Sequence, residues 1–123
     1  MPSTILIVDD HEAVRSALRN WLIEKFPSFR IMEMTSGEEA IAKIKEVSPH
    51  LIIMDFKLPG MDGLALLKRI QDSHLDAMKI LITAYRSEVV ISEAINMGVK
   101  EIIEKPFTSK IIEATLSRLI EAR

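Results

Sequence analysis

The sequence predicts an α/β fold in which five βα units form a doubly wound, five-stranded parallel sheet. Short apolar runs alternate along the chain with longer segments whose apolar residues recur at helical spacing. The run over residues 51–54 lies between Ser48-Pro49 and Pro59-Gly60 and is too short for a helix, so we expect a strand buried on both faces. Asp55 ends this run, and polar residues also follow other runs.

The first half of the chain supplies three predicted strands and two predicted helices. Val14, Leu18 and Leu22 have the spacing of one helical face, and Ser36 is a suitable N-cap before the acidic pair Glu38-Glu39. We therefore expect a strand over Thr4–Val8, a helix from residue 11 to about 26, an edge strand over 29–34, a helix from Ser36 to about residue 47 and a central strand over Leu51–Asp55.

The second half continues the same alternation. Ser87 is placed to cap a helix, and Gly98 is placed to end it. The predicted elements are a helix from 61–63 to about 73, a strand over 80–83, a helix from Ser87 to Gly98, a strand over 99–103 and a last helix that starts at Thr108 or Ser109 and runs to Arg123.

Polar side chains at the carboxyl ends of the predicted strands indicate a functional site. Asp9 and Asp10 follow the first strand, Asp55 ends the third, Thr83 ends the fourth, and Lys105 comes soon after the fifth. In an open parallel sheet these ends meet at one crevice, where ligands bind. Asp9 and Asp10 have an alternative explanation, because such residues also terminate strands and cap helices. Asp55, Thr83 and Lys105 at the same edge favour a site.

The charges at this edge predict a magnesium ion. Two carboxylates about 4 Å apart repel by roughly 4 kcal/mol at an effective dielectric constant of 20. Lys105 offsets one of three negative charges, and the remaining oxygen ligands suit Mg²⁺. A metal, an amine and the Thr83 hydroxyl can together hold a phosphoryl group. Asp55, on the central strand, is then the best candidate nucleophile for forming an acyl phosphate.

Four motifs resemble those of the receiver domains of two-component response regulators, over essentially the whole chain. They are Ile7-Val8-Asp9-Asp10, the segment Met54-Asp55-Phe56-Lys57-Leu58-Pro59-Gly60-Met61-Asp62-Gly63, Thr83-Ala84 and Lys105-Pro106-Phe107. The resemblance implies strand order 2-1-3-4-5. It also implies one receiver domain over residues 1–123, which is either complete or the N-terminal part of a longer regulator.

The same resemblance implies a role for each site residue. Asp55 would accept a phosphoryl group from a sensor histidine kinase or a phosphotransfer protein, and Thr83 and Lys105 would hold its oxygens. Mg²⁺ would be held by Asp10 directly, by Asp9 largely through water, by Asp55 and by the backbone carbonyl of Lys57. The Lys105-Pro106 bond is expected to be cis. The implied role is signalling, with catalysis limited to autophosphorylation from a donor and autodephosphorylation.

Two positions give expectations specific to this chain. Ile102 stands where the family usually carries Tyr or Phe, so we expect switching through the segment after Thr83 and the next helix, without a ring movement. Tyr85 is expected to hinder the water that hydrolyses the phosphoryl group; a half-exposed loop aromatic is the alternative. Ile91 and Ile95, with Ile111, indicate a partner face on the fourth and fifth helices, open to a homodimer, although scattered surface apolarity is common.

Composition narrows the function classes. A net charge of −2 and a pI near 5.9 argue against direct nucleic-acid binding by this domain. No apolar run reaches the ~20 residues of a membrane span, there is no leader pattern, and cysteine is absent, so we expect a cytoplasmic location. His11, His50 and His74 share no ligand spacing, and His11 is expected to be a surface loop residue near the site rim.

Three alternative functions share parts of this pattern. A flavin-binding flavodoxin-like module would need a hydroxyl- and amide-rich loop after the first strand, where Asp9-Asp10-His11-Glu12 stands instead. A small phosphatase with an Asp nucleophile would need two acids spaced two residues apart, and here they are adjacent. A receiver that only binds partners would not need the complete set of acids, Thr83 and Lys105. The phosphoacceptor hypothesis therefore accounts for the most residues.

Overall fold

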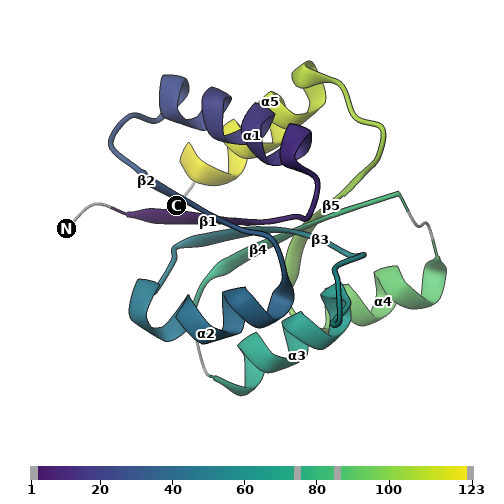
Figure 1. Cartoon of the computed structure of the whole chain (residues 1–123). Coiled ribbons are helices and arrows are strands. Elements are labelled where there is room, and N and C mark those ends of the chain that lie inside the picture. The colour runs from purple at the N-terminus through teal and green to yellow at the C-terminus, as the bar shows by residue number, and fades with distance from the viewer. Residues whose placement is uncertain (1–2, 74–75, 85–86, 122–123) are drawn as a thin grey trace.

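Five parallel strands form a single sheet in the order β2-β1-β3-β4-β5, as expected (Figure 1). A computed structural model describes residues 3–73, 76–84 and 87–121 of the chain. The strands are β1 (Thr4–Val8), β2 (Arg30–Met34), β3 (Leu51–Asp55), β4 (Met78–Thr83) and β5 (Val99–Glu104). Because β3 lies in the middle and runs parallel to its neighbours, the residue at its carboxyl end is flanked by the ends of β1 and β4.

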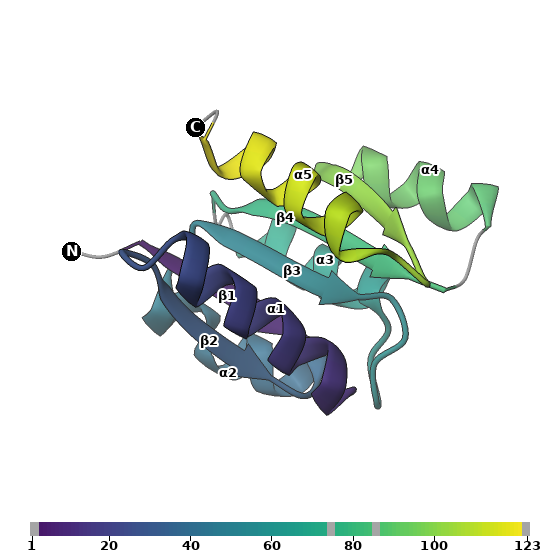
Figure 2. The ribbon, with the colours of Figure 1, turned by 90° about the horizontal axis from the view of Figure 1, so that it is seen from above.

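Helices cover both faces of the sheet. The helices α1 (Glu12–Lys25) and α5 (Ser109–Glu121) lie on one face, and α2 (Gly37–Val47), α3 (Gly63–Asp72) and α4 (Glu88–Asn96) lie on the other (Figures 1 and 2). None of the described helices is long and apolar enough to cross a membrane. The result is the predicted doubly wound α/β arrangement.

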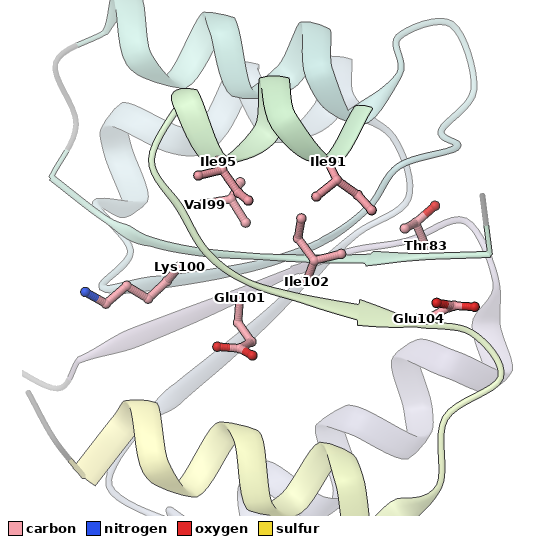
Figure 3. A pocket seen from close by; sticks show the side chains of 8 residues that line it. All are labelled: Thr83, Ile91, Ile95, Val99, Lys100, Glu101, Ile102 and Glu104. Atoms are coloured by element: carbon pink, nitrogen blue, oxygen red, sulfur yellow. The ribbon is translucent and has the colours of Figure 1, made fainter. Parts of the chain in front are cut away.

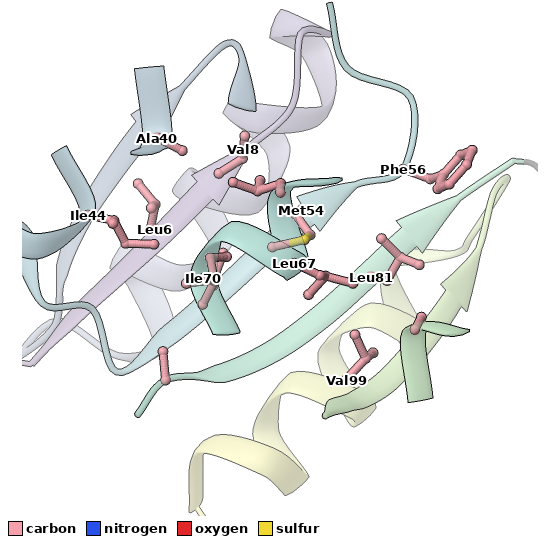
Figure 4. Close-up of a cluster of buried hydrophobic side chains, with 14 of the residues drawn as sticks. Leu6, Val8, Ala40, Ile44, Met54, Phe56, Leu67, Ile70, Leu81 and Val99 are labelled. Atoms are coloured by element: carbon pink, nitrogen blue, oxygen red, sulfur yellow. The ribbon is translucent and has the colours of Figure 1, made fainter. Parts of the chain in front are cut away.

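The strands β1 and β3 are buried along their whole length, and β4 is buried from Ile80 to Thr83, which explains their apolar runs. On β1, Leu6 and Val8 join the core beneath α2, α3 and α4 (Figure 4), whereas Ile5 and Ile7 join the core beneath α1 and α5. Alternate residues of a strand point to opposite faces, so a strand with two covered faces needs apolar residues at every position.

Local sequence signals place the helix starts. The Ser36 hydroxyl accepts a hydrogen bond from the Glu39 N–H at 3.1 Å, and Ser87 caps α4 in the same way through Val90, both as predicted. Asp62 caps α3 by accepting from the Ala65 N–H at 2.9 Å. These caps satisfy N–H groups that have no partner inside the helix.

Three strand boundaries differ from the sequence prediction. β4 begins at Met78 instead of residue 80, because Met78 and Lys79 pair with Leu51 and Ile52 of β3. β5 continues to Glu104, which pairs with Thr83, and β2 begins at Arg30, which pairs with Thr4. Backbone pairing with a neighbouring strand thus makes β4 and β5 longer than their apolar runs. It makes β2 one residue shorter than predicted.

Candidate functional site

The carboxyl ends of the strands bring the predicted polar residues together. Asp9 directly follows β1, Asp55 ends β3 and Thr83 ends β4; all three are buried, whereas Asp10 is exposed. The Lys105 N–H donates to the Thr83 carbonyl at 2.8 Å, which ties the segment after β5 to the end of β4. Lys57 is exposed and lines the same pocket as Asp55 and Lys105.

Lys105 is the cation inside this cluster. Its Nζ lies 2.8 Å from Oδ2 of Asp55 and 3.4 Å from Oδ2 of Asp9, and its side chain is 17% exposed. Burial of the ammonium acts to lower the pKa of Lys105. The hydrogen bond and charge of Asp55, together with those of Asp9, outweigh burial and raise the pKa above its usual value. Lys105 is therefore positively charged at neutral pH.

His11 is exposed, as predicted, and lies closer to the acidic residues than a position at the rim implies. Its Nδ1 lies 3.0 Å from Oδ1 of Asp9, 3.3 Å from Oδ1 of Asp10 and 3.8 Å from Oδ2 of Asp55. The backbone N–H of His11 also donates a hydrogen bond to Oδ1 of Asp9 at 2.8 Å. The side chain is 62% exposed, so the expected exposure is correct, but the ring belongs to the site and not merely to its rim.

The cluster has the composition of a metal site. Asp9, Asp10, His11 and Asp55 each offer a ligand atom, and these atoms all lie within 4.8 Å of one another. Three carboxylates and one ammonium leave an excess of negative charge among oxygen donors, which suits a hard divalent cation. The residues present therefore fit the ion that the sequence predicted.

Two backbone hydrogen bonds hold the end of β3 in place. The Phe56 N–H donates to the Ile82 carbonyl at 3.1 Å, and the Gly63 N–H at the start of α3 donates to the Phe56 carbonyl at 2.6 Å. Across the pocket, the peptide bond between Lys105 and Pro106 is cis, as the motif resemblance implied.

Arg15 of α1 also reaches the site, a contact that the sequence pattern does not indicate. Its Nη1 donates to the backbone carbonyl of Asp9 at 2.7 Å, and its Nε lies 3.3 Å from a carboxylate oxygen of Glu33 on β2. A helix pattern assigns arginine to the solvent side. Only its position, one turn inside the helix that follows the acidic pair, could have indicated the contact.

A groove between α4 and β5 surrounds Ile102. Ile91 and Ile95 project from α4 toward Ile102 and Val99 of β5, with Thr83 at one end of the groove (Figure 3). Ile102 is half-buried, Ile95 is 57% exposed and Ile111 on α5 is 52% exposed. The predicted apolar residues of α4 therefore line one groove, together with the charged Lys100, Glu101 and Glu104, whereas Ile111 lines a separate pocket. A partner at this face stays a prediction. Tyr85 and His74 lie outside the described residues.

Comparison with known proteins identifies the family. The family model for the response regulator receiver domain matches residues 5–117. The chain belongs to the response regulator receiver family. It is 35% identical over 116 residues to the chemotaxis protein CheY of Bacillus subtilis, an alignment that covers 93% of this chain and 95% of that protein. Receiver domains act in two-component signalling with histidine kinases.

Other receivers of known sequence or structure agree. The probable C4-dicarboxylate response regulator DctR of Halalkalibacterium halodurans is 32% identical over 118 residues, but the chain spans only about half of its length, 51%. The CheY-like receiver of Methanospirillum hungatei has a solved structure that superposes with a TM-score of 0.87 at 26% identity, covering 99% of this chain and 96% of that one. The fold and the signalling class of this chain follow from these matches.

Proposed function

We propose that this receiver accepts a phosphoryl group on Asp55. The observation that carries the proposal is the environment of this carboxylate: it is buried at the end of the central strand, and it receives the Lys105 ammonium at 2.8 Å. A buried carboxylate needs compensating charge, and here the charge stands beside the atom that would bind phosphorus. Asp9 and Asp10 carry the same charge but lie at the end of β1, away from the sheet centre.

The transfer moves a phosphoryl group from a histidine nitrogen of the donor protein to a carboxylate oxygen of Asp55. A carboxylate oxygen of Asp55 attacks the phosphorus of a phosphohistidine on a sensor kinase or a phosphotransfer protein. The new O–P bond forms as the N–P bond breaks, and the electron pair of that bond returns to the imidazole nitrogen. Lys105 offsets the charge on the phosphoryl oxygens, and the Thr83 hydroxyl donates a hydrogen bond to one of them.

Mg²⁺ is the ion that we propose for the acidic cluster. Asp10, Asp9, Asp55 and the Lys57 carbonyl would hold it, and when bound it neutralises negative charge on the phosphoryl group. The cluster geometry supports this assignment, because the ligand atoms of Asp9, Asp10 and Asp55 lie within 4.8 Å of one another. The Lys57 carbonyl is proposed from its place in the motif and from the position of Lys57 in the same pocket.

The proposed output is a change at the α4 and β5 face. Thr83 lies at one end of the groove that Ile91, Ile95 and Ile102 line, so movement of Thr83 toward a phosphoryl group would alter this face. We consider two partners for the α4 and β5 face: a second copy of the chain, and an output domain following Arg123. The whole chain would act as one receiver domain.

Intact-mass spectrometry after incubation with acetyl phosphate and Mg²⁺ tests the proposal. We expect a single phosphoryl adduct on the wild-type chain, no adduct on Asp55→Asn, and none after chelation of the metal. Asp62→Asn is the matched control, because Asp62 is exposed and an asparagine can still cap α3. An unmodified wild-type chain would favour a receiver that only binds partners, and an adduct on Asp55→Asn would assign the chemistry to another residue.

A further inference from the structure

The two peptide groups that flank Asp9 are each held by a hydrogen bond. The Asp9 N–H donates to the Met34 carbonyl at the end of β2, at 3.1 Å. The Asp9 carbonyl accepts from Nη1 of Arg15 at 2.7 Å, the short distance typical of a charged donor. The Asp9 carbonyl belongs to the peptide that carries Asp10, so this bond fixes the backbone of both acids.

Glu33 holds the Arg15 guanidinium in position. One carboxylate oxygen of Glu33 lies 3.3 Å from Nε of Arg15, and the other lies 3.2 Å from Nε of Arg19. The Arg15 side chain is only 14% exposed, whereas that of Arg19 is 43% exposed. Glu33 pairs with Ile7 in the sheet register, so this ion pair links α1 to β2. The buried Nε of Arg15 makes no hydrogen bond with the described residues, so Glu33 acts on the guanidinium through its charge.

We propose that Arg15 is a positioning residue for the acidic metal site. Arg15 acts through its hydrogen bond to the Asp9 carbonyl. The ion pair with Glu33 of β2 favours the side-chain position in which Arg15 makes that bond. Groups that orient metal ligands without touching the metal typically contribute about 10- to 100-fold to metal affinity. The proposal rests on the proposed function only in taking the acidic cluster as the metal site. It assigns the first helix and the edge strand a part in building that site.

Arg19 separates this role from simple structural support. Among the contacts of the described residues, Arg15 and Arg19 both pair with Glu33, but only Arg15 also bonds the Asp9 carbonyl. If both arginines have a purely structural role, removing either guanidinium should change the Mg²⁺ affinity of the site by the same small amount. A positioning role predicts that only the loss of Arg15 lowers this affinity substantially. Arg15→Met and Arg19→Met are thus a matched pair that preserves most of each aliphatic stem.

Calorimetric titration with Mg²⁺ and amide hydrogen exchange together test the proposal. We expect Mg²⁺ affinity to fall about tenfold or more in Arg15→Met and to change by less than about twofold in Arg19→Met, with partial rescue in Arg15→Lys. In the metal-free chain, the His11 amide, which donates to Asp9, should exchange about tenfold faster in Arg15→Met only. Melting temperatures identify any variant that is globally unfolded.

The two measurements separate this proposal from the proposed function. Equal losses of affinity in Arg15→Met and Arg19→Met, or an unchanged His11 exchange rate in Arg15→Met, would overturn the positioning role. A wild-type chain that does not bind Mg²⁺ would instead contradict the proposed metal. The exchange rate of His11 would still decide whether Arg15 fixes the acidic pair. If Arg15→Met is unfolded, the comparison of Arg15→Gln with Arg19→Gln, which removes the charge at each position, gives the same test.

Discussion

Lys105 sets the charge balance at the scale of single residues. Its ammonium lies between Asp55 and Asp9, and these carboxylates raise its pKa despite the burial that acts to lower it. A lysine whose pKa is higher in the folded than in the unfolded chain stabilises the fold fully at pH values below the unfolded pKa, about 10.4. That stabilisation is lost as the pH rises through the higher folded pKa.

The pH dependence of stability tests this balance. Without metal, Lys105→Met should lower the free energy of unfolding at pH 7, because it leaves buried carboxylates without their cation. The difference between wild type and variant should stay constant up to about pH 10 and shrink above it. Urea denaturation of both proteins from pH 7 to 11 measures the difference. A gap that shrinks below pH 9 would show that the pKa is lowered.

Sequence reasoning located some site residues and missed others for a physical reason. The sequence predicts that Asp55, Thr83 and Lys105 lie together, because the carboxyl ends of parallel strands meet at one edge of the sheet whichever rotamers the side chains adopt. The ring of His11 and the guanidinium of Arg15 reach the site through their rotamers, and no periodicity predicts a rotamer. The roles of all these residues stay predictions until they are measured.

The start of α3 shows how an element supports the site. A Cβ added at Gly63 would lie 2.9 Å from the Cα of Phe56 and 3.1 Å from the carbonyl oxygen of Asp55, both backbone atoms. For a Cβ added at Gly37, at the start of α2, the three nearest atoms all belong to the side chain of Met61, with its sulfur at 3.0 Å. Methionine can move aside, whereas the end of β3 cannot.

The two glycines therefore predict different costs. Gly63→Ala should lower the free energy of unfolding by about 1–3 kcal/mol, because α3 must move away from the residue that carries the site. Gly37→Ala should change it by less than about 1 kcal/mol, since alanine favours the helix and Met61 can adjust. Chemical denaturation measures both. A cost below about 1 kcal/mol for Gly63→Ala would mean that the close contact at Gly63 is relieved without consequence.

At the same scale, strand limits were the least predictable part of the fold. The apolar pattern gave the type and order of the elements, including the buried central strand. It did not predict that Lys79, a charged residue, belongs to β4, because that depends on hydrogen bonds to β3 and not on the side chain. Element type follows from side-chain periodicity, whereas strand length also follows from the neighbouring strand.

Across the whole molecule, the groove beside Ile102 links the site to a surface. Thr83 ends the strand beside β3 and also lines the groove under α4, so one residue belongs to both regions. Position 102, which lines this groove, is occupied by isoleucine and not by an aromatic residue. We therefore predict that phosphorylation changes the segment after Thr83 and α4 without a ring movement at position 102.

Hydrogen exchange of the free and phosphorylated chains tests this route. Phosphorylation should change the exchange rates of α4 amides in wild type and in Thr83→Ser, which keeps the hydroxyl. In Thr83→Ala the adduct should still form, but the change at α4 should be largely lost. An equal change in Thr83→Ala, or no change in wild type, would show that Thr83 does not connect the site to α4.

Chemical mapping of the phosphoryl group tests the central claim most directly. An acyl phosphate is reduced by borohydride to a primary alcohol, so the modified aspartate becomes homoserine, which peptide mass spectrometry locates. After treatment with acetyl phosphate and Mg²⁺, we expect homoserine at Asp55 and unmodified Asp9 and Asp10. Homoserine at Asp9 or Asp10, or none in a chain that carries the phosphoryl mass, would contradict Asp55 as the acceptor.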